Sequence, residues 1–168
     1  FSSTEEFSRI KWVAKESDLL YRPLYSDIIR VAGMIGLNRA RMRDVVAQLA
    51  GRNSEVKSFN RVDSYLREIA ESSFVRFDNA ITSIVNEYNY KRFEQDILRG
   101  SGFSSSSMFS SVNALNYAFS IYHKLLALNI DYADVRSMTR RFLVFSILTE
   151  HHSGSFETRW DRDFKSFD

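Results

Sequence analysis

The residue types best suited to catalysis gather near the C-terminus. His151 and His152 follow Glu150 directly, and Glu157 and Asp161 stand four residues apart. Imidazoles and carboxylates can hold a metal ion or transfer protons. Adjacent helical residues point about 100° apart, so the two histidines cannot bind one metal in the i, i+4 manner. A polar helix end near the helix dipole is the simpler interpretation, and we predict neither a metal site nor a cofactor.

The carboxylates of this region alternate with arginines. Glu157, Asp161 and Asp163 are interleaved with Arg159 and Arg162. Residues four apart share a helix face, and paired carboxylates on one face suit metal binding or acid–base chemistry. The interleaved charges favour the alternative, a solvated helix face held by salt bridges.

Two arginine clusters have the chemistry of a phosphate-binding surface. Arg39 and Arg43 stand four residues apart, as do Arg136 and Arg140, and Arg141 follows directly. The guanidinium group is suited to bidentate phosphate contacts. We therefore take Arg39, Arg43, Arg140 and Arg141 as candidate nucleic-acid or phosphate-binding residues. An ordinary charged helix face is the alternative.

The elements that position these residues are predicted to be helices. The chain has 168 residues, of which 44% are hydrophobic, with one proline and six glycines. Few helix breakers and widespread helical spacing of apolar residues predict an all-α fold without strands. We expect a single domain of about seven or eight helices over residues 1–168. The serine-rich residues 99–110 are the one candidate for a boundary within it.

Charge and composition exclude several classes of protein. The formal net charge is only +2, so a nucleic-acid role would need local clusters rather than a strongly basic domain. With no cysteine there is no disulfide framework and no thiolate site. We expect no membrane-spanning helix, no signal peptide and a cytoplasmic location. Because the chain begins with Phe1, we expect a fragment of a longer protein.

Helix ends can be assigned along the first half of the chain. An amphipathic helix is expected around residues 4–14, and Pro23 fits the first turn of the next helix, which should stop at Gly36. Asn38 is expected to cap a third helix that ends before Gly51. A long helical stretch then covers residues 62–98. We expect it to break either around Ser72 and Ser73 or at residues 86–89.

Three further helices are expected in the second half. The first follows the serine-rich run, with Ser107 or Ser110 as its cap, and the second runs from residue 131 or 132 to Glu150. The last begins near Ser155. For the second of these, helical spacing predicts an inward apolar face made of Val135, Met138, Phe142, Phe145 and Leu148.

The turn before the last helix has a physical interpretation of its own. Gly154 permits a tight backbone turn, Ser155 can cap the helix, and Glu157 suits its first turn. We expect Arg140 or Arg141 to bond this loop or Glu157. A helix–turn–helix corner is the structural interpretation, and a phosphate or nucleic-acid contact at the helix N-terminus is the alternative.

Residues 140–167, RRFLVFSILTEHHSGSFETRWDRDFKSF, resemble the helical region of the GmrSD family, the type IV modification-dependent restriction enzymes and their relatives. His152 stands where an aromatic residue is common in that family, and Phe164 stands where leucine is common. The matching residues are Arg141, Phe142, Ser153, Gly154, Ser155, Glu157, Thr158, Asp163, Phe164 and Lys165.

The resemblance implies a part rather than a whole enzyme. Such proteins begin with a ParB/sulfiredoxin-like domain that carries a D-G-Q-Q-R motif, and many end with an HNH-type nuclease domain. Neither motif occurs in these 168 residues, so no catalytic residue is predicted here. The resemblance implies a non-catalytic helical domain in a nucleotide-dependent, phage-defence endonuclease. Its expected partners are the remaining domains, DNA and a second copy of the chain. The alternative is a purely structural dimerisation or interaction domain that binds no nucleic acid.

Overall fold

The computed structural model describes residues 18–51, 63–150 and 156–165. Within these ranges seven α-helices and three shorter helical segments are present, without a strand, which confirms the predicted all-α, multi-helix domain. The α-helices are α2 (Tyr25–Leu37), α3 (Met42–Leu49), α4 (Asp63–Ile84), α5 (Glu87–Arg92), α6 (Val112–Ala127), α7 (Tyr132–Leu148) and α8 (Phe156–Lys165). The shorter segments are the π-helix η1 (Phe93–Leu98) and the 3-10 helices η2 (Arg99–Ser101) and η3 (Ser106–Met108).

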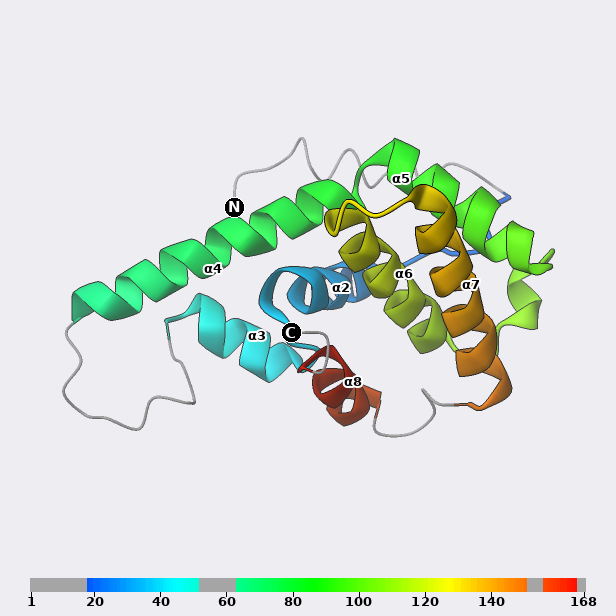
Figure 1. Cartoon of the computed structure of the whole chain (residues 1–168). Helices are drawn as coiled ribbons and strands as arrows, with labels where there is room; N and C mark the ends of the chain where they lie inside the picture. The colour runs from blue at the N-terminus through cyan, green and yellow to red at the C-terminus, as the bar shows by residue number, and fades with distance from the viewer. Residues whose placement is uncertain (1–17, 52–62, 151–155, 166–168) are drawn as a thin grey trace.

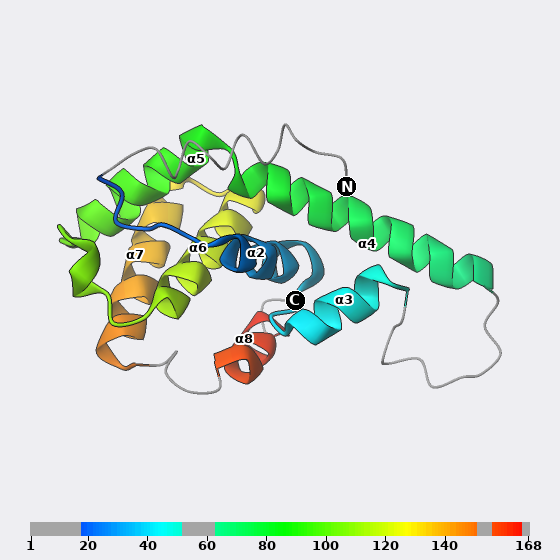
Figure 2. The same cartoon turned by 180° about the vertical axis from the view of Figure 1, so that it is seen from behind.

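The helices surround α2 and α6 (Figure 1). Helix α2 packs against both α4 and α6, α6 packs against α7, and α3 lies along α4. Helix α4 extends as a rod beyond the rest of the body on the side of α3, away from α5 and α7. Seen from behind, the extended chain ahead of α2 crosses the body before it enters that helix (Figure 2).

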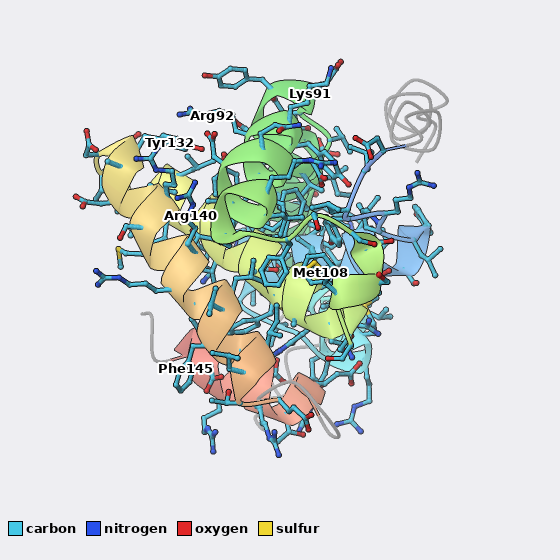
Figure 3. All side chains as sticks on the ribbon, turned by 90° about the vertical axis from the view of Figure 1, so that its right-hand side faces the viewer. Lys91, Arg92, Met108, Tyr132, Arg140 and Phe145 are labelled. Atoms are coloured by element: carbon cyan, nitrogen blue, oxygen red, sulfur yellow. The ribbon has the colours of Figure 1, made fainter. Side chains whose placement is uncertain are left out.

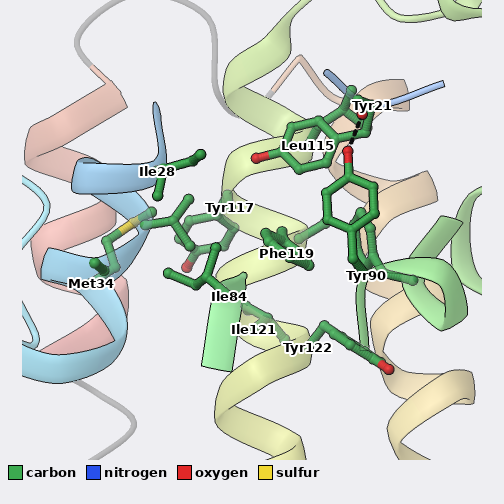
Figure 4. Packing of buried hydrophobic residues seen from close by; sticks show 14 of the residues in the cluster. Tyr21, Ile28, Met34, Ile84, Tyr90, Leu115, Tyr117, Phe119, Ile121 and Tyr122 are labelled. Carbon is green, nitrogen blue, oxygen red and sulfur yellow. Dashed lines mark hydrogen bonds between the residues drawn. The ribbon is translucent and has the colours of Figure 1, made fainter. Parts of the chain in front are cut away.

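Helix α6 is the centre of the core. Ten consecutive residues of α6, 114–123, are buried. A helix buried on all sides must be covered by neighbours on every face. Its Phe119 ring lies 4.7 Å from Phe93 and 5.4 Å from Tyr21, measured between centroids, so aromatic rings from three segments meet there (Figure 4). Such ring pairs add to stability beyond the apolar area that they bury.

The ends of α2 and α3 correct three expectations. Pro23 lies ahead of α2 rather than in its first turn, and the helix continues through Gly36 to Leu37. Asn38 has φ of 54° and ends α2, instead of capping α3, because asparagine tolerates the left-handed region. Gly51 follows α3 with φ of 68°, as expected.

The long helical stretch breaks at the second of the two expected places. Helix α4 ends at Ile84, and the Asn86 side chain caps α5 by accepting the Asn89 N–H at 3.1 Å. There is no break at the two serines: the Ser72 hydroxyl donates to the Ile69 carbonyl at 3.0 Å within the helix. The π-helix that continues α5 was not expected from the sequence.

The serine-rich segment separates η1 from α6, but neither expected serine caps the helix. Ser111 does so, accepting the Asn113 N–H at 3.2 Å, whereas Ser107 belongs to η3 and Ser110 precedes the cap. The expected amphipathic helix at residues 4–14 lies outside the described residues.

Helix α7 is rotated from the expected orientation. Val135 is buried, but Met138 is 49% exposed, Phe145 61% and Leu148 78%. The face turned inward includes the small polar residue Thr139, whose hydroxyl donates to the carbonyl four residues earlier at 2.7 Å. Since this local bond satisfies the hydroxyl, a small polar residue can be buried where the apolar pattern alone predicts a large one.

Candidate functional site

Two side chains of α8, Thr158 and Asp161, fasten this helix to the connection between α2 and α3. One carboxylate oxygen of Asp161 accepts the backbone N–H of Ala40 at 2.6 Å, and the other lies 3.6 Å from Arg41 Nε. Arg41 also donates from Nη2 to Thr158 Oγ1 at 2.8 Å. A carboxylate that satisfies a backbone N–H and a guanidinium at once is positioned for docking, not for accepting a proton from a substrate.

Glu157, in the first turn of α8, is paired with an arginine of α2. Arg30 Nη2 lies 3.5 Å from Glu157 Oε1, while Arg30 Nη1 lies 3.6 Å from Asp27 Oδ1. The expectation that Arg140 or Arg141 bonds Glu157 is therefore replaced by Arg30, which sequence reasoning missed. The i, i+3 spacing of Asp27 and Arg30 was the signal of a charged pair, but nothing local pointed to α8.

Trp160 inserts α8 into the core. Its side chain is fully buried and stacks on Tyr117 of α6, with 5.4 Å between ring centroids. The Tyr117 hydroxyl donates to Asp163 Oδ2 at 3.4 Å, and burial, then the charge of Asp163, raises the pKa of Tyr117. Asp163 thus faces a hydroxyl that stays protonated at ordinary pH.

The remaining motif-loop residues and the two adjacent histidines fall outside the described residues; these are Ser153, Gly154, Ser155, His151 and His152. Among the residues that the structure describes, no group of three or more histidine or carboxylate side chains is arranged to hold a metal ion.

The four predicted phosphate-binding arginines do not form one surface. Arg39 and Arg43 lie at α3, whereas Arg140 and Arg141 belong to α7, which stands apart from α3 in both overall views (Figures 1 and 2). The Arg43 side chain is 85% exposed, with Asp44 at 3.5 Å, and Arg39 donates to the neighbouring Asn38 carbonyl at 3.2 Å.

Arg140 holds the π-helix. Its Nε donates to the Asp96 carbonyl at 2.5 Å, and its guanidinium lies so close to Gly100 that a Cβ there would be 1.9 Å from Nη2. Arg141, one residue later, is exposed. Of the pair, Arg141 is therefore the one directed to the surface.

A polar cluster that the sequence did not reveal joins η1 to α7 (Figure 3). Tyr132 donates its hydroxyl to Asp96 Oδ2 at 2.6 Å, and the Arg92 guanidinium lies 3.2 Å over the Tyr132 ring and 3.7 Å from Asp96 Oδ2. Burial and the hydrogen bond to Asp96 raise the pKa of Tyr132. These groups satisfy one another, so the cluster fixes the π-helix rather than presenting a reactive group.

Glu94 is the most deeply buried carboxylate of the described chain. It is 2% exposed and accepts the backbone N–H groups of Leu20 at 2.7 Å and Tyr21 at 3.3 Å. The Arg99 Nη2 atom lies 3.7 Å from Glu94 Oε1. Burial raises the pKa of Glu94, although the two backbone hydrogen bonds act to lower it. Its role is to hold the non-helical chain before α2.

His123 is a core residue. Its Nδ1 lies 2.9 Å from Ser83 Oγ, and its ring packs edge-on against Phe119 with 4.5 Å between centroids. Burial lowers the pKa of His123 to about 3, so the imidazole is neutral at ordinary pH. Among the described residues no carboxylate is recorded at the ring, so this pair has no third group of a nucleophilic triad there.

A groove of about 490 Å³ lies beside the chain that precedes α2, lined by residues 18–22, the serines at 104–106, Phe109, Val112 and Leu115. Its one carboxylate, Asp18, accepts from Arg99 at 3.2 Å. Arg22, serine hydroxyls, backbone groups and apolar side chains make up the rest of the lining. The groove therefore offers contact surface but no acid–base pair.

In the described part of the chain, no helix has both the length and the apolar character needed to span a bilayer. Comparisons with models of protein families, with curated proteins and with solved structures found no match to this chain.

Proposed function

We propose that this chain is the non-catalytic helical domain of a GmrSD-like restriction or defence protein, in which it scaffolds the nuclease and nucleotide-hydrolysing parts. The observation that carries the proposal is the use of three carboxylates of α8, two of which belong to the family-like motif. Glu157, Asp161 and Asp163 face Arg30, the Ala40 N–H and the Tyr117 hydroxyl, all within the helical body. Carboxylates that bond to the helical body hold α8 in place, and they are therefore not available to react with a substrate.

An exposed apolar stripe on α7 supports a scaffold role. Met138, Phe145 and Leu148 lie on the outer side of the helix, with exposed fractions of 49%, 61% and 78%. Arg141, three residues after Met138 and four before Phe145, lies on the same face and is exposed. Apolar side chains gathered on one exposed face are typical of a surface that contacts another protein or domain. We assign this stripe to the contact with the remaining domains of the parent protein.

The activity claim is tested on the purified chain. With Mg²⁺, nucleoside triphosphates and plasmid DNA, we expect neither nucleotide hydrolysis nor DNA cleavage above a mock preparation. Hydrolysis that is lost in Asp161→Asn would contradict the proposal, because it would place a docking carboxylate in an active site.

The contact claim is tested with the parent's other domains supplied separately. Phe145→Asp should abolish their capture by this chain, whereas Val46→Asp, at a 59%-exposed position on α3, should leave capture unchanged. Equal capture by both variants would show that the α7 stripe is not the contact.

DNA contact is a second candidate function, favoured by the exposed guanidinium groups of Arg43 and Arg141. Binding that depends on phosphates weakens steeply with salt, because condensed counterions are released. We expect Arg43→Gln with Arg141→Gln to weaken binding of a DNA duplex and to reduce its salt dependence, and Arg162→Gln to leave both unchanged. Absence of binding at low salt would remove this function and leave the purely structural interaction domain.

A further inference from the structure

Part of the chain ahead of α2, residues 19–21, is buried although it forms no helix. Residues 18–21, here called the strap, include Leu20 and Tyr21, which are 6% and 1% exposed. Buried backbone outside regular structure must find partners elsewhere. Glu94 accepts the Leu20 and Tyr21 N–H groups, and the Tyr90 hydroxyl donates to the Tyr21 carbonyl (Figure 4). Helix α5 and the π-helix therefore hold the strap by its backbone.

A chain of polar contacts leads from the strap through the core. The Tyr21 hydroxyl donates to Asn116 Oδ1 at 2.7 Å, and Asn116 Nδ2 donates to Asp27 Oδ1 at 2.8 Å. Arg30 then bridges Asp27, at 3.6 Å, and Glu157, at 3.5 Å. These five residues, here called the polar relay, join the strap, α6, α2 and the first turn of α8.

The relay fixes the orientation of Asn116. This side chain is fully buried, and its oxygen and nitrogen each have one partner of opposite kind. If the strap moves, the oxygen loses its donor, and a buried acceptor without a donor is costly. The amide is then held by Asp27 alone, so its N–H is no longer fixed in position at the Asp27 carboxylate.

Arg30 is the point at which this change reaches α8. Its guanidinium is shared between Asp27 and Glu157, and its side chain is 19% exposed, so the attraction is only partly screened. An Asp27 carboxylate that has lost the Asn116 N–H attracts the guanidinium more strongly. Arg30 is thereby drawn from Glu157, and the first turn of α8 loses its ion pair.

We infer that the polar relay couples the strap to α8, so that displacement of the strap loosens the seating of α8 on α2. The inference rests on the proposed scaffold function and deepens it. It names the route by which a partner acting on the strap changes the end of the domain that carries α8. The coupling itself is a property of this chain and can be measured without any partner.

Amide hydrogen exchange on the full chain tests the coupling. Tyr21→Phe removes only the hydroxyl and keeps the ring in the core. We expect exchange of the hydrogen-bonded amides of α8 to become roughly two- to thirty-fold faster, the range of coupling found along such networks. Tyr132→Phe, which removes a hydroxyl bonded to Asp96 outside the relay, should leave α8 unchanged.

The reciprocal variant tests the coupling from the partly exposed end, where the fold is not at risk. Glu157→Gln should accelerate exchange at the Leu20 and Tyr21 amides, since coupling between two sites acts in both directions. Glu71→Gln, the same change on an exposed face of α4, is the matched control. In the double variant, Tyr21→Phe should add nothing at α8 to the effect of Glu157→Gln.

Two results would overturn the inference: α8 exchange in Tyr21→Phe equal to that of the unmodified chain, or additive effects of Tyr21→Phe and Glu157→Gln. Neither result bears on capture of the parent's domains or on hydrolysis. Failure of the relay is therefore distinguishable from failure of the scaffold function.

Discussion

Trp160 stacks on Tyr117 with 5.4 Å between their ring centroids and 26° between their planes. Tyr117 in turn lies 5.0 Å from the Phe142 ring of α7, so one tyrosine of α6 joins α7 and α8. This ring pair places the C-terminal motif against the core, and the polar contacts of Asp161 and Arg41 then fix its orientation. Helix α8 is thus docked on the body by an apolar centre and a polar rim.

Removing the Trp160 ring should release α8. We expect Trp160→Ala to lower the free energy of unfolding by about 3–5 kcal/mol, the cost of deleting a buried aromatic side chain. Urea denaturation followed by circular dichroism measures this loss. Trp160→Phe keeps a ring on Tyr117 and should cost clearly less, and equal stability of the alanine variant and the unmodified chain would contradict the docking of α8.

Gly36 is required where α2 crosses α4. A Cβ at this position would lie 2.6 Å from the Arg76 carbonyl oxygen, and a backbone atom cannot move aside. Alanine would gain about 1 kcal/mol of helix propensity. Overpacking outweighs that gain, and we expect Gly36→Ala to destabilise the protein by about 2 kcal/mol net.

The matched comparison for Gly36 is Gly100, where a Cβ would meet the end of the flexible Arg140 side chain. Gly100→Ala should cost about 1 kcal/mol, through loss of the Arg140 hydrogen bond to Asp96. In an Arg140→Ala background the same substitution should cost nothing. Chemical denaturation of the four variants checks this, and a larger loss at Gly100 than at Gly36 would contradict the prediction.

His123 should make the protein less stable in acid. Its folded-state pKa of about 3 is below the unfolded value of 6.5, so the unfolded chain binds the extra proton between these values. The His123 contribution is therefore complete above pH 6.5 and declines as the pH falls toward 3. Between pH 7.5 and 5.0 the loss should be about 2 kcal/mol.

The variant His123→Gln isolates that contribution, because the carboxylates titrate equally in both proteins. The difference in unfolding free energy between the two proteins should shrink by about 2 kcal/mol when the pH is lowered from 7.5 to 5.0. A difference that is independent of pH would show that the folded protein accepts the proton on His123.

The helical fold was predictable because local signals agree with it. Sparse glycine and proline and the 3.6-residue spacing of apolar side chains predict helices, and Asn86 and Asp131 are residue types that commonly begin them. Errors arose where one residue type suits two roles. Asparagine, as at Asn38, can begin a helix or end one. Glycine, as at Gly36, can end a helix or allow a neighbouring helix to pack closely against the backbone.

The site was predictable only in part, because its partners are distant in the chain. The sequence correctly predicted a last helix with Glu157 in its first turn. Arg30 and Arg41, which contact this helix, are separated from it by more than a hundred residues. Glu94 carries no local signal that it is buried. Nor does periodicity predict the exposed Phe145, because the inward face of α7 includes the polar residues Thr139 and Ser146 beside Val135 and Leu143.

The Arg41–Asp161 pair gives the most direct test of the central claim that polar contacts of α8 dock this helix on the body. A double-mutant cycle compares the unfolding free energies of the unmodified chain, Arg41→Ala, Asp161→Ala and the double variant. We predict a coupling of about 1 kcal/mol, because the carboxylate bonded to the Ala40 N–H is also held by Arg41. Additivity of the two single changes within about 0.3 kcal/mol would contradict the account.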